Sequence, residues 1–156
     1  MESNLTAGAK APDFKLATDG NGSVSLSDFA GKKVVLYFYP KANTPGCTKE
    51  AIAFSALKPA FAKANTVVIG VSADAVAAQD KFKAKHKLTT PLASDPTHKM
   101  LTAYGVWGKK SLYGRIFSGI TRTTVLIGPD GRIAQVWPKV KVDGHAEEVL
   151  AAAKAL

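Results

Sequence analysis

The sequence predicts an α/β sandwich of three layers built around a mixed central sheet. Two apolar runs of strand length, Lys33–Tyr39 and Thr66–Val71, are separated by a long stretch at helical spacing. This pattern is typical of two parallel strands joined by a helix. Farther along the chain, the turn Gly128-Pro129-Asp130-Gly131 separates two more strand-like segments, which indicates an antiparallel hairpin. A sheet with parallel and antiparallel neighbours follows from these observations.

The first half of the chain supplies the central strand and the longest helix. We expect an irregular N-terminal segment, followed by a short strand and turn over Val24–Ala30. The next run is apolar almost throughout and ends at Pro40, as expected for a strand buried on both faces. Helical spacing then extends from Pro45 to about Ala64, and Pro59 within it predicts a kink or a break.

The second half of the chain alternates shorter elements. Asp74 is placed to cap a helix that runs to about His86, and Asp95-Pro96-Thr97 opens a shorter helix that ends before Gly105. The two hairpin strands and a final Ala-rich helix complete the series, at Thr123–Ile127, Arg132–Trp137 and His145–Leu156. This order of elements is the layout of a thioredoxin-like α/β sandwich, which we expect to form one domain over residues 1–156.

Composition limits the class of protein. A chain of 156 residues, 46% hydrophobic and 21% charged, is typical of a globular domain with a sizeable core. No segment approaches the roughly 18 uncharged apolar residues that span a bilayer. Met1–Pro12 lacks the basic start and apolar run of a secretory signal, and a secreted domain would more often carry paired cysteines than one. We therefore expect a cytoplasmic protein.

The chain is basic, with 21 Lys and Arg against 12 Asp and Glu and a formal charge of +9. Such an excess can indicate nucleic acid or an acidic membrane surface as a partner. The basic residues are nevertheless spread from Lys10 to Lys154, and the densest run, Lys81–Lys87, would wrap around a helix. We interpret that run as a solvated face and expect neither nucleic acid nor membrane binding. The charge would instead attract an acidic partner or a small anion.

The residues that carry chemistry lie between Tyr39 and Glu50, where an apolar strand ends and a helix begins. Thr44 is a good N-cap and Pro45 suits the first helical position, so Cys47 falls in the first turn. The first amides of a helix lack internal partners and carry partial positive charge, which favours a thiolate there. Gly46 has no side chain to block an incoming oxygen. A lone cysteine is more often a small buried hydrophobe, but this setting favours a nucleophile.

This segment resembles the active-site signature of the peroxiredoxins, and in detail that of the bacterioferritin comigratory protein, or Q-type, group. The resemblance extends from about Gly8 onward and includes the stretches Tyr37–Pro40, Gly70–Asp74, Tyr104–Gly108, Gly119–Thr124 and Val140–His145. It implies a thiol-dependent peroxidase that reduces hydrogen peroxide and organic hydroperoxides. It also implies that no metal or organic cofactor is needed, because sulfur itself takes up the oxygen.

The resemblance assigns roles to individual residues. Cys47 would be the peroxidatic cysteine, Thr44 would donate its hydroxyl to the peroxide, and Pro40 would shield the pocket from water. Arg122 would stabilise both the thiolate and the leaving oxygen, with Glu50 in a supporting position. These roles agree with the chemistry, because fixed donors aimed at a developing charge lower the barrier and an arginine is always charged.

Structural alternatives exist for the same residues. Thr44 could serve as a helix cap alone, Glu50 suits a first helical turn through the dipole alone, and Arg122 could be an ordinary exposed residue before a strand. The three histidines, His86, His98 and His145, lack metal-ligand spacing and are interpreted as surface or structural residues.

The sequence departs from the Q-type pattern in lacking a resolving cysteine. Many members carry one five residues after the first or on the following helix. This chain has Ile52, interpreted as a core residue, at the first position and no cysteine in the helix over Asp74–Lys87. Five helical residues rise about 7.5 Å, too far for a disulfide without unwinding. The sulfenic acid must therefore react with an external thiol, such as glutathione, a thioredoxin, a glutaredoxin or a second copy. We expect a monomer or a weak dimer.

Two other functions remain compatible with the sequence. A thioredoxin-like thiol exchange protein would use Thr44-Pro45-Gly46-Cys47, which has the Cys-x-x-Cys spacing with Thr first. Such an exchanger needs both sulfurs to release its mixed disulfide, which argues against it. A non-enzymatic holdase on the same fold would retain its function in Cys47→Ser.

Overall fold

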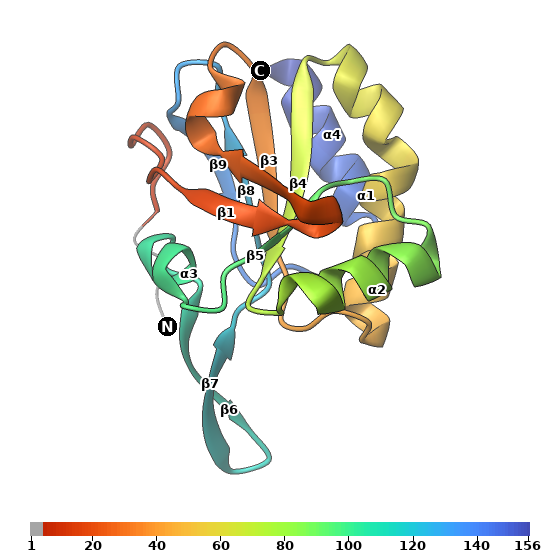
Figure 1. Ribbon diagram of the computed structural model, residues 1–156. Coiled ribbons are helices and arrows are strands. Elements are labelled where there is room, and N and C mark those ends of the chain that lie inside the picture. The colour runs from red at the N-terminus through yellow and green to blue at the C-terminus, as the bar shows by residue number, and fades with distance from the viewer. Residues whose placement is uncertain (1–4) are drawn as a thin grey trace.

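The computed structural model describes residues 5–156, which form the predicted mixed sheet between two layers (Figure 1). The sheet has seven strands, two of which, Lys15–Thr18 and Leu92–Ser94, were not predicted. The strand order is β2-β1-β5-β4-β3-β8-β9. These strands are β1 (Lys15–Thr18), β2 (Gly22–Ser25), β3 (Lys33–Phe38), β4 (Thr66–Ser72), β5 (Leu92–Ser94), β8 (Thr123–Ile127) and β9 (Ile133–Trp137). A second sheet consists of β6 (Trp107–Leu112) and β7 (Arg115–Ile120).

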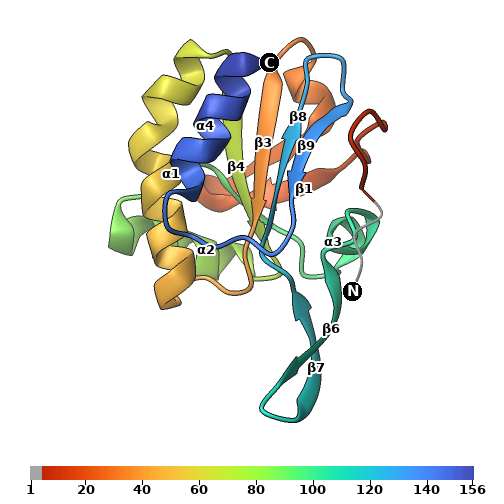
Figure 2. The same ribbon diagram turned by 180° about the vertical axis from the view of Figure 1, so that it is seen from behind.

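The two central strands are parallel and are joined by α1 (Pro45–Lys63), while β8 lies antiparallel on the other side of β3. Successive side chains of β3 point to opposite faces of the sheet. Val35 and Tyr37 pack into the layer of α1, α2 (Val76–His86) and α4 (His145–Ala155), where α1 and α4 lie side by side (Figure 2). Val34 and Leu36 pack against α3 (Lys99–Ala103) and the N-terminal segment.

The predicted break at Pro59 is wrong, because α1 continues through it to Lys63. Proline has no N–H to donate to the carbonyl four residues earlier, which here belongs to Ser55. The Thr89 hydroxyl donates to that carbonyl at 3.2 Å, and the Thr89 amide donates to the Ser55 hydroxyl at 3.0 Å. The loop before β5 thus supplies the partner that the helix itself lacks.

Two further expectations need correction. The N-terminal segment is not irregular throughout, because β1 pairs with both β2 and β5. Asp74 does not cap α2, which begins after Ala75 without a side-chain cap. The Asp74 carboxylate instead accepts the Ala42 amide and the Ser72 hydroxyl, each at 2.7 Å, and so holds the loop between β3 and α1. The short helix before Gly105 ends as predicted, at Ala103.

The β6–β7 hairpin was not anticipated from the sequence. It extends away from the sheet at the same end of the molecule as the beginning of α1 (Figures 1 and 2). Its two-residue turn places Tyr113 at φ 51° and Gly114 at φ 75°. Positive φ at both positions defines a type I′ turn, for which Asn-Gly is the usual signal and Tyr-Gly a poor one.

Candidate active site

The loop after β3 leads directly into α1, as the sequence predicted. Thr44 is the residue before the helix, in extended conformation, and Pro45 is the first helical residue. The Thr44 side chain, however, makes no capping hydrogen bond. Its hydroxyl donates to the carbonyl of Lys41 at 2.8 Å and closes the loop, so the expected capping role of the side chain is wrong.

Cys47 lies in the first turn of α1 with an exposed fraction of 1%. The Arg122 guanidinium, from the link between β7 and β8, donates from Nη2 to the Cys47 Sγ at 3.3 Å. A Cβ on Gly46 would lie 3.2 Å from that same Nη2 atom. The glycine therefore leaves room for the guanidinium to approach the sulfur.

Glu50 lies one turn farther along α1 and is also 1% exposed. Its Oε1 accepts a hydrogen bond from Arg122 Nη1 at 2.7 Å, while its Oε2 has no hydrogen-bond partner among the described residues. Burial raises the pKa of Glu50 to about 7, and the neighbouring Arg122 offsets only part of that effect. Burial lowers the pKa of Arg122, but Glu50 and Cys47 outweigh it and raise the pKa overall. One guanidinium is thus shared by the thiol and a buried carboxyl group.

The backbone around Arg122 is fixed from two sides. Its carbonyl accepts the Val140 amide at 2.9 Å, which ties it to the loop before α4. The preceding Thr121 amide donates to the Val106 carbonyl at 2.9 Å, at the base of the hairpin. Because the Arg122 carbonyl and the Thr121 amide are both anchored, the backbone that carries the guanidinium is fixed beside the beginning of α1.

The loop before Cys47 is held by residues that sequence reasoning did not single out for this role. Pro40 is half-buried at the bend after β3. Asn43 adopts φ 63°, a left-handed conformation that asparagine tolerates, and its Oδ1 lies 2.9 Å from His86 Nε2. An asparagine just before a helix start was the one available signal for such a turn.

Ile52 is not a core residue, because 46% of it is exposed. Five residues along a helix amount to a rotation of about 140° beyond a full turn, so a buried Cys47 directs position 52 outward. Ile52 lines an open groove of about 430 Å³ together with Asn43, Pro45, Thr48, Lys49 and His86.

The three histidines have the surface or structural positions that were expected. His86 contacts Asn43 on the surface, and His98 stacks on Trp107 with ring centroids 3.7 Å apart. His145 is buried, with Nε2 2.8 Å from the Thr124 hydroxyl. Among the described residues, no three or more His, Cys, Asp or Glu side chains are grouped to hold a metal ion.

A thioredoxin-like fold with a thiol beside a guanidinium at a helix start defines a thiol enzyme of the thioredoxin-like class. The sequence model of the AhpC/TSA family matches residues 7–136. The putative peroxiredoxin Bcp of Coxiella burnetii is 49% identical, over 94% of this chain and 97% of that protein. Peroxiredoxin Bcp of Bacillus subtilis is 46% identical, over 94% and 93%.

Solved structures agree. The bacterioferritin comigratory protein of Xanthomonas campestris, studied for alkyl peroxide reduction, matches with a TM-score of 0.89 and 43% identity over 99% of this chain and 98% of that one. A Cys-to-Ser variant of PrxQ from Xylella fastidiosa matches with a TM-score of 0.92 and 42% identity, at the same coverage. The chain therefore belongs to the AhpC/TSA family and, within it, to the Bcp (Q-type) peroxiredoxins.

This membership makes the chain a thiol-dependent peroxidase that acts on peroxides and takes electrons from thiols. The thiol-exchange and holdase alternatives are not favoured. The sole cysteine of the sequence fits the one-cysteine mechanism. No helix in the described part of the chain has the length and apolar character needed to cross a membrane.

Proposed function

We propose that Cys47 is the peroxidatic nucleophile and that Arg122 is the residue that activates it. The observation that carries this proposal is the contact of 3.3 Å between Arg122 Nη2 and Cys47 Sγ, made by a guanidinium whose other nitrogen is held by Glu50. A positive charge at that distance favours the thiolate, the form that attacks peroxide. Because Cys47 is the only cysteine, no other thiol in the chain can take this role.

In the first step the Cys47 thiolate attacks one oxygen of R–O–O–H. A sulfur–oxygen bond forms, the O–O bond breaks, and its electron pair leaves on the other oxygen, which takes up a proton to give an alcohol or water. The Arg122 donors stabilise the departing charge, and the Thr44 hydroxyl turns from the Lys41 carbonyl to donate to the same peroxide. Pro40 keeps water from the sulfur, while Glu50 positions the guanidinium and Gly46 leaves it room.

In the second step the sulfenic acid of Cys47 is reduced by an external thiol, because the chain has no second cysteine. Thioredoxin, glutaredoxin and glutathione are the candidate donors, and they are kept reduced in the cytoplasm, where we expect this single domain of 156 residues to act. The reaction needs no metal or organic cofactor. We expect the protein to work as a monomer or weak dimer without nucleic acid or membrane.

The test is steady-state consumption of peroxide in the presence of an external thiol. Cys47→Ser differs by one atom and should fold with the same thermal stability, yet it should consume no peroxide above the background of the thiol alone. Retained activity in a folded Cys47→Ser protein would remove Cys47 from the mechanism.

A further inference from the structure

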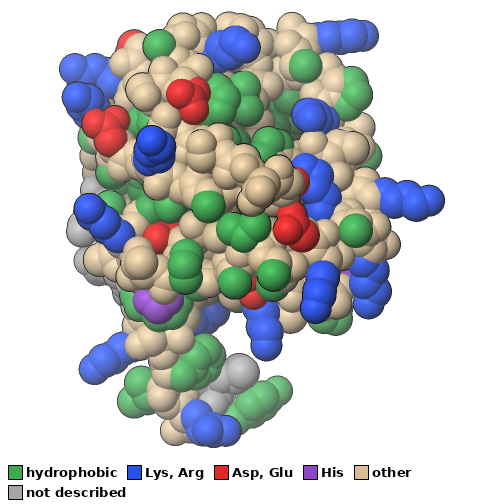
Figure 3. Space-filling view, in the orientation of Figure 1, with side chains coloured by type: hydrophobic (Ala, Val, Ile, Leu, Met, Phe, Trp, Pro, Cys, Tyr) green, Lys and Arg blue, Asp and Glu red, His purple; other side chains and the backbone are tan. Residues whose placement is uncertain are grey.

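The β6–β7 hairpin presents large apolar side chains to solvent. Tyr113 is 95% exposed, Ile116 74% and Phe117 43%. Only two other large hydrophobic residues are exposed in the described part of the chain, Ile52 and Leu156. Exposed apolar side chains that gather on one projecting element mark an interaction surface more often than scattered ones do. Figure 3 shows hydrophobic side chains gathered at the end of the projection.

The same hairpin is basic. The chain has no acidic residue between Asp95 and Asp130, whereas Lys109, Lys110 and Arg115 all lie on the hairpin. Lys110 Nζ donates to the Ile120 carbonyl at 2.8 Å and lies 6.0 Å from the centre of the Phe117 ring. Lys109 and Arg115 form no ion pair with any described residue. An acidic surface would therefore complement this hairpin.

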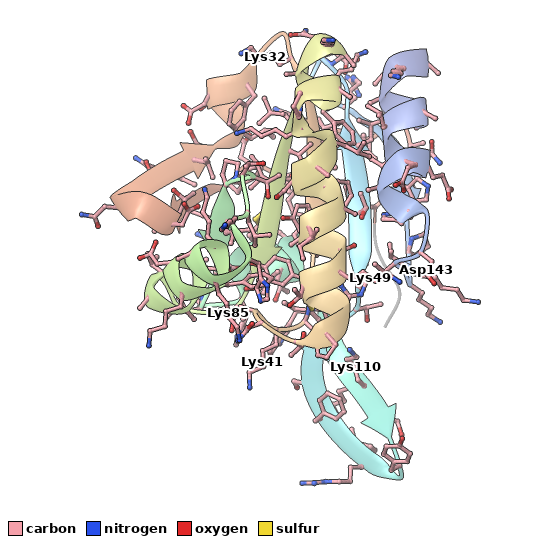
Figure 4. The ribbon with its side chains drawn as sticks, turned by 90° about the vertical axis from the view of Figure 1, so that its right-hand side faces the viewer. Lys32, Lys41, Lys49, Lys85, Lys110 and Asp143 are labelled. Carbon is pink, nitrogen blue, oxygen red and sulfur yellow. The ribbon has the colours of Figure 1, made fainter. Side chains whose placement is uncertain are left out.

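The hairpin and the active site face the same end of the molecule. Strand β7 ends at Ile120, two residues before Arg122. In Figure 4, Lys110 lies just beyond the beginning of α1, with Lys41 and Lys85 on one side and Lys49 on the other. Lys32 is at the opposite end. Lys49 is paired with Asp143, whereas Lys41, Lys85 and Lys110 form no ion pair with a described residue. A molecule that approaches Cys47 from this end therefore also meets the hairpin and these three lysines.

We propose that the β6–β7 hairpin is a docking arm for the protein that reduces oxidised Cys47, a dithiol protein of the thioredoxin class with an acidic surface around its thiols. This inference rests on the proposed one-cysteine function. A strand of six residues spans roughly 20 Å, so the end of the hairpin lies beyond the reach of a small thiol bound at the sulfur but within that of a protein.

The chemistry of the hairpin also fits a protein partner. Tyrosine, phenylalanine and arginine are the types enriched at the centres of protein interfaces, and a basic rim accelerates association with an acidic partner. A second copy of this chain is a poor occupant, because each copy carries a charge of +9 and the hairpin itself is basic.

The docked partner reduces the sulfenic acid of Cys47 in two thiol exchange steps. One thiolate of the partner attacks the sulfenic sulfur of Cys47, which forms a mixed disulfide and expels hydroxide that takes up a proton to become water. The second thiolate of the partner then attacks the partner's own sulfur in that disulfide. Cys47 leaves as a thiolate, reduced by two electrons, and the partner's dithiol becomes a disulfide. Because Cys47 is 1% exposed, the first turn of α1 must open for the mixed disulfide to form.

The experiment compares two reductants on one set of variants. The double variant Tyr113→Asn/Ile116→Thr removes the apolar end while keeping residues that suit a type I′ turn and a strand. Leu156→Thr is the matched control, since Leu156 is 50% exposed at the C-terminus, at the far end of the molecule. Peroxide turnover is measured with a thioredoxin, its reductase and NADPH, and separately with dithiothreitol.

We expect kcat/KM for thioredoxin to fall about tenfold or more in the double variant, as for the loss of one interface hot spot. Turnover with dithiothreitol and oxidation by peroxide should stay unchanged, and Leu156→Thr should match the unaltered protein. The charge reversal Lys109→Glu/Arg115→Glu should likewise raise KM for thioredoxin, whereas Lys32→Glu should not.

Equal thioredoxin kinetics in the unaltered protein and both hairpin variants would overturn the docking arm and leave the peroxidase intact. A dimer in sedimentation that the double variant abolishes would overturn it as well, because the hairpin would then serve self-association. If the unaltered protein is not oxidised by peroxide at all, the proposed function fails, which is a separate result.

Discussion

Replacing Arg122 by alanine is the most informative single perturbation of the site. The substitution removes the donor that lies 3.3 Å from the Cys47 sulfur and, at the same time, the only hydrogen-bond partner of the Glu50 carboxyl group among the described residues. Loss of one preorganised donor to a developing charge slows a reaction by about 10²–10³-fold, or about 3–4 kcal/mol. We expect the rate constant for oxidation of Cys47 to fall by that factor.

The variant should nevertheless fold. Breaking a buried ion pair costs about 3–5 kcal/mol when the remaining group keeps its charge. Glu50 can avoid most of this cost, because burial already raises its pKa to about 7 and loss of the guanidinium raises it further. The carboxyl group will take up a proton at neutral pH, and a neutral buried carboxyl is far less costly than a charged one.

The assay is stopped-flow oxidation of the reduced protein at several peroxide concentrations, which yields the second-order rate constant. Arg122→Lys should give an intermediate rate, since an ammonium keeps the charge but cannot bridge sulfur and carboxyl as a planar fork does. Arg132→Ala is the matched control, because Arg132 is an exposed arginine directly before β9. Its Cys47 should be oxidised at the rate of the unaltered protein. A folded Arg122→Ala protein that reacts at the unaltered rate would refute the role of the guanidinium.

The remaining predictions concern three other positions. The pKa of Glu50 is about 7 in the folded protein and 4.5 for the free group, so the folded state binds more protons between these two pH values. The free energy of unfolding should therefore fall by about 3 kcal/mol as pH rises from 4.5 to about 7. Glu50→Gln should abolish that slope in pH-dependent melts, and an unchanged slope would assign it to other groups. Gly46→Ala places a Cβ 3.2 Å from Arg122 Nη2, so oxidation of Cys47 should slow about tenfold without loss of thermal stability. Equal rates would show that the guanidinium does not need a glycine at position 46 to reach the sulfur. Ile52→Cys, at a position 46% exposed, should form an intramolecular disulfide after one peroxide turnover and resist over-oxidation, with Ile52→Ser as the control; free thiols that persist would show that α1 does not unwind far enough.

The central elements were predictable because their signals are local. Five of the six residues of β3 are buried, and burial on both faces requires the apolar run that the sequence displays. The start of α1 was likewise evident from Thr44 and Pro45, whose backbone preferences suit the residue before a helix and its first position.

The features that were missed depend on partners far away in the chain or on no partner at all. Nothing in the sequence around Pro59 shows that Thr89 satisfies the Ser55 carbonyl. The β6–β7 hairpin has a mostly exposed second strand, so it lacks the alternation of apolar and polar residues that burial of one face imposes. Ile52 was wrongly assigned to the core because its apolar character predicts burial. The buried residues Cys47, Ala51 and Phe54 decide which face of α1 points inward, and Ile52 lies on another face.

The site itself was predictable only in part. Helix geometry alone placed Cys47 in the first turn of α1, but the partner of that sulfur lies 75 residues later in the sequence. Resemblance, and not spacing, indicated that Arg122 would be near. The raised pKa of Glu50 could not be foreseen, because it follows from how fully the surrounding core encloses the carboxyl group.

The claim on which the account depends is that one thiol of this chain reacts with peroxide far faster than an ordinary thiol. Reduced protein mixed with one equivalent of hydrogen peroxide should gain one oxygen on Cys47, seen by intact mass and by a sulfenic-acid trap, before free cysteine in the same mixture is consumed. If free cysteine is oxidised first, or if Cys47 stays reduced, then the guanidinium beside the sulfur does not make it a peroxidatic residue.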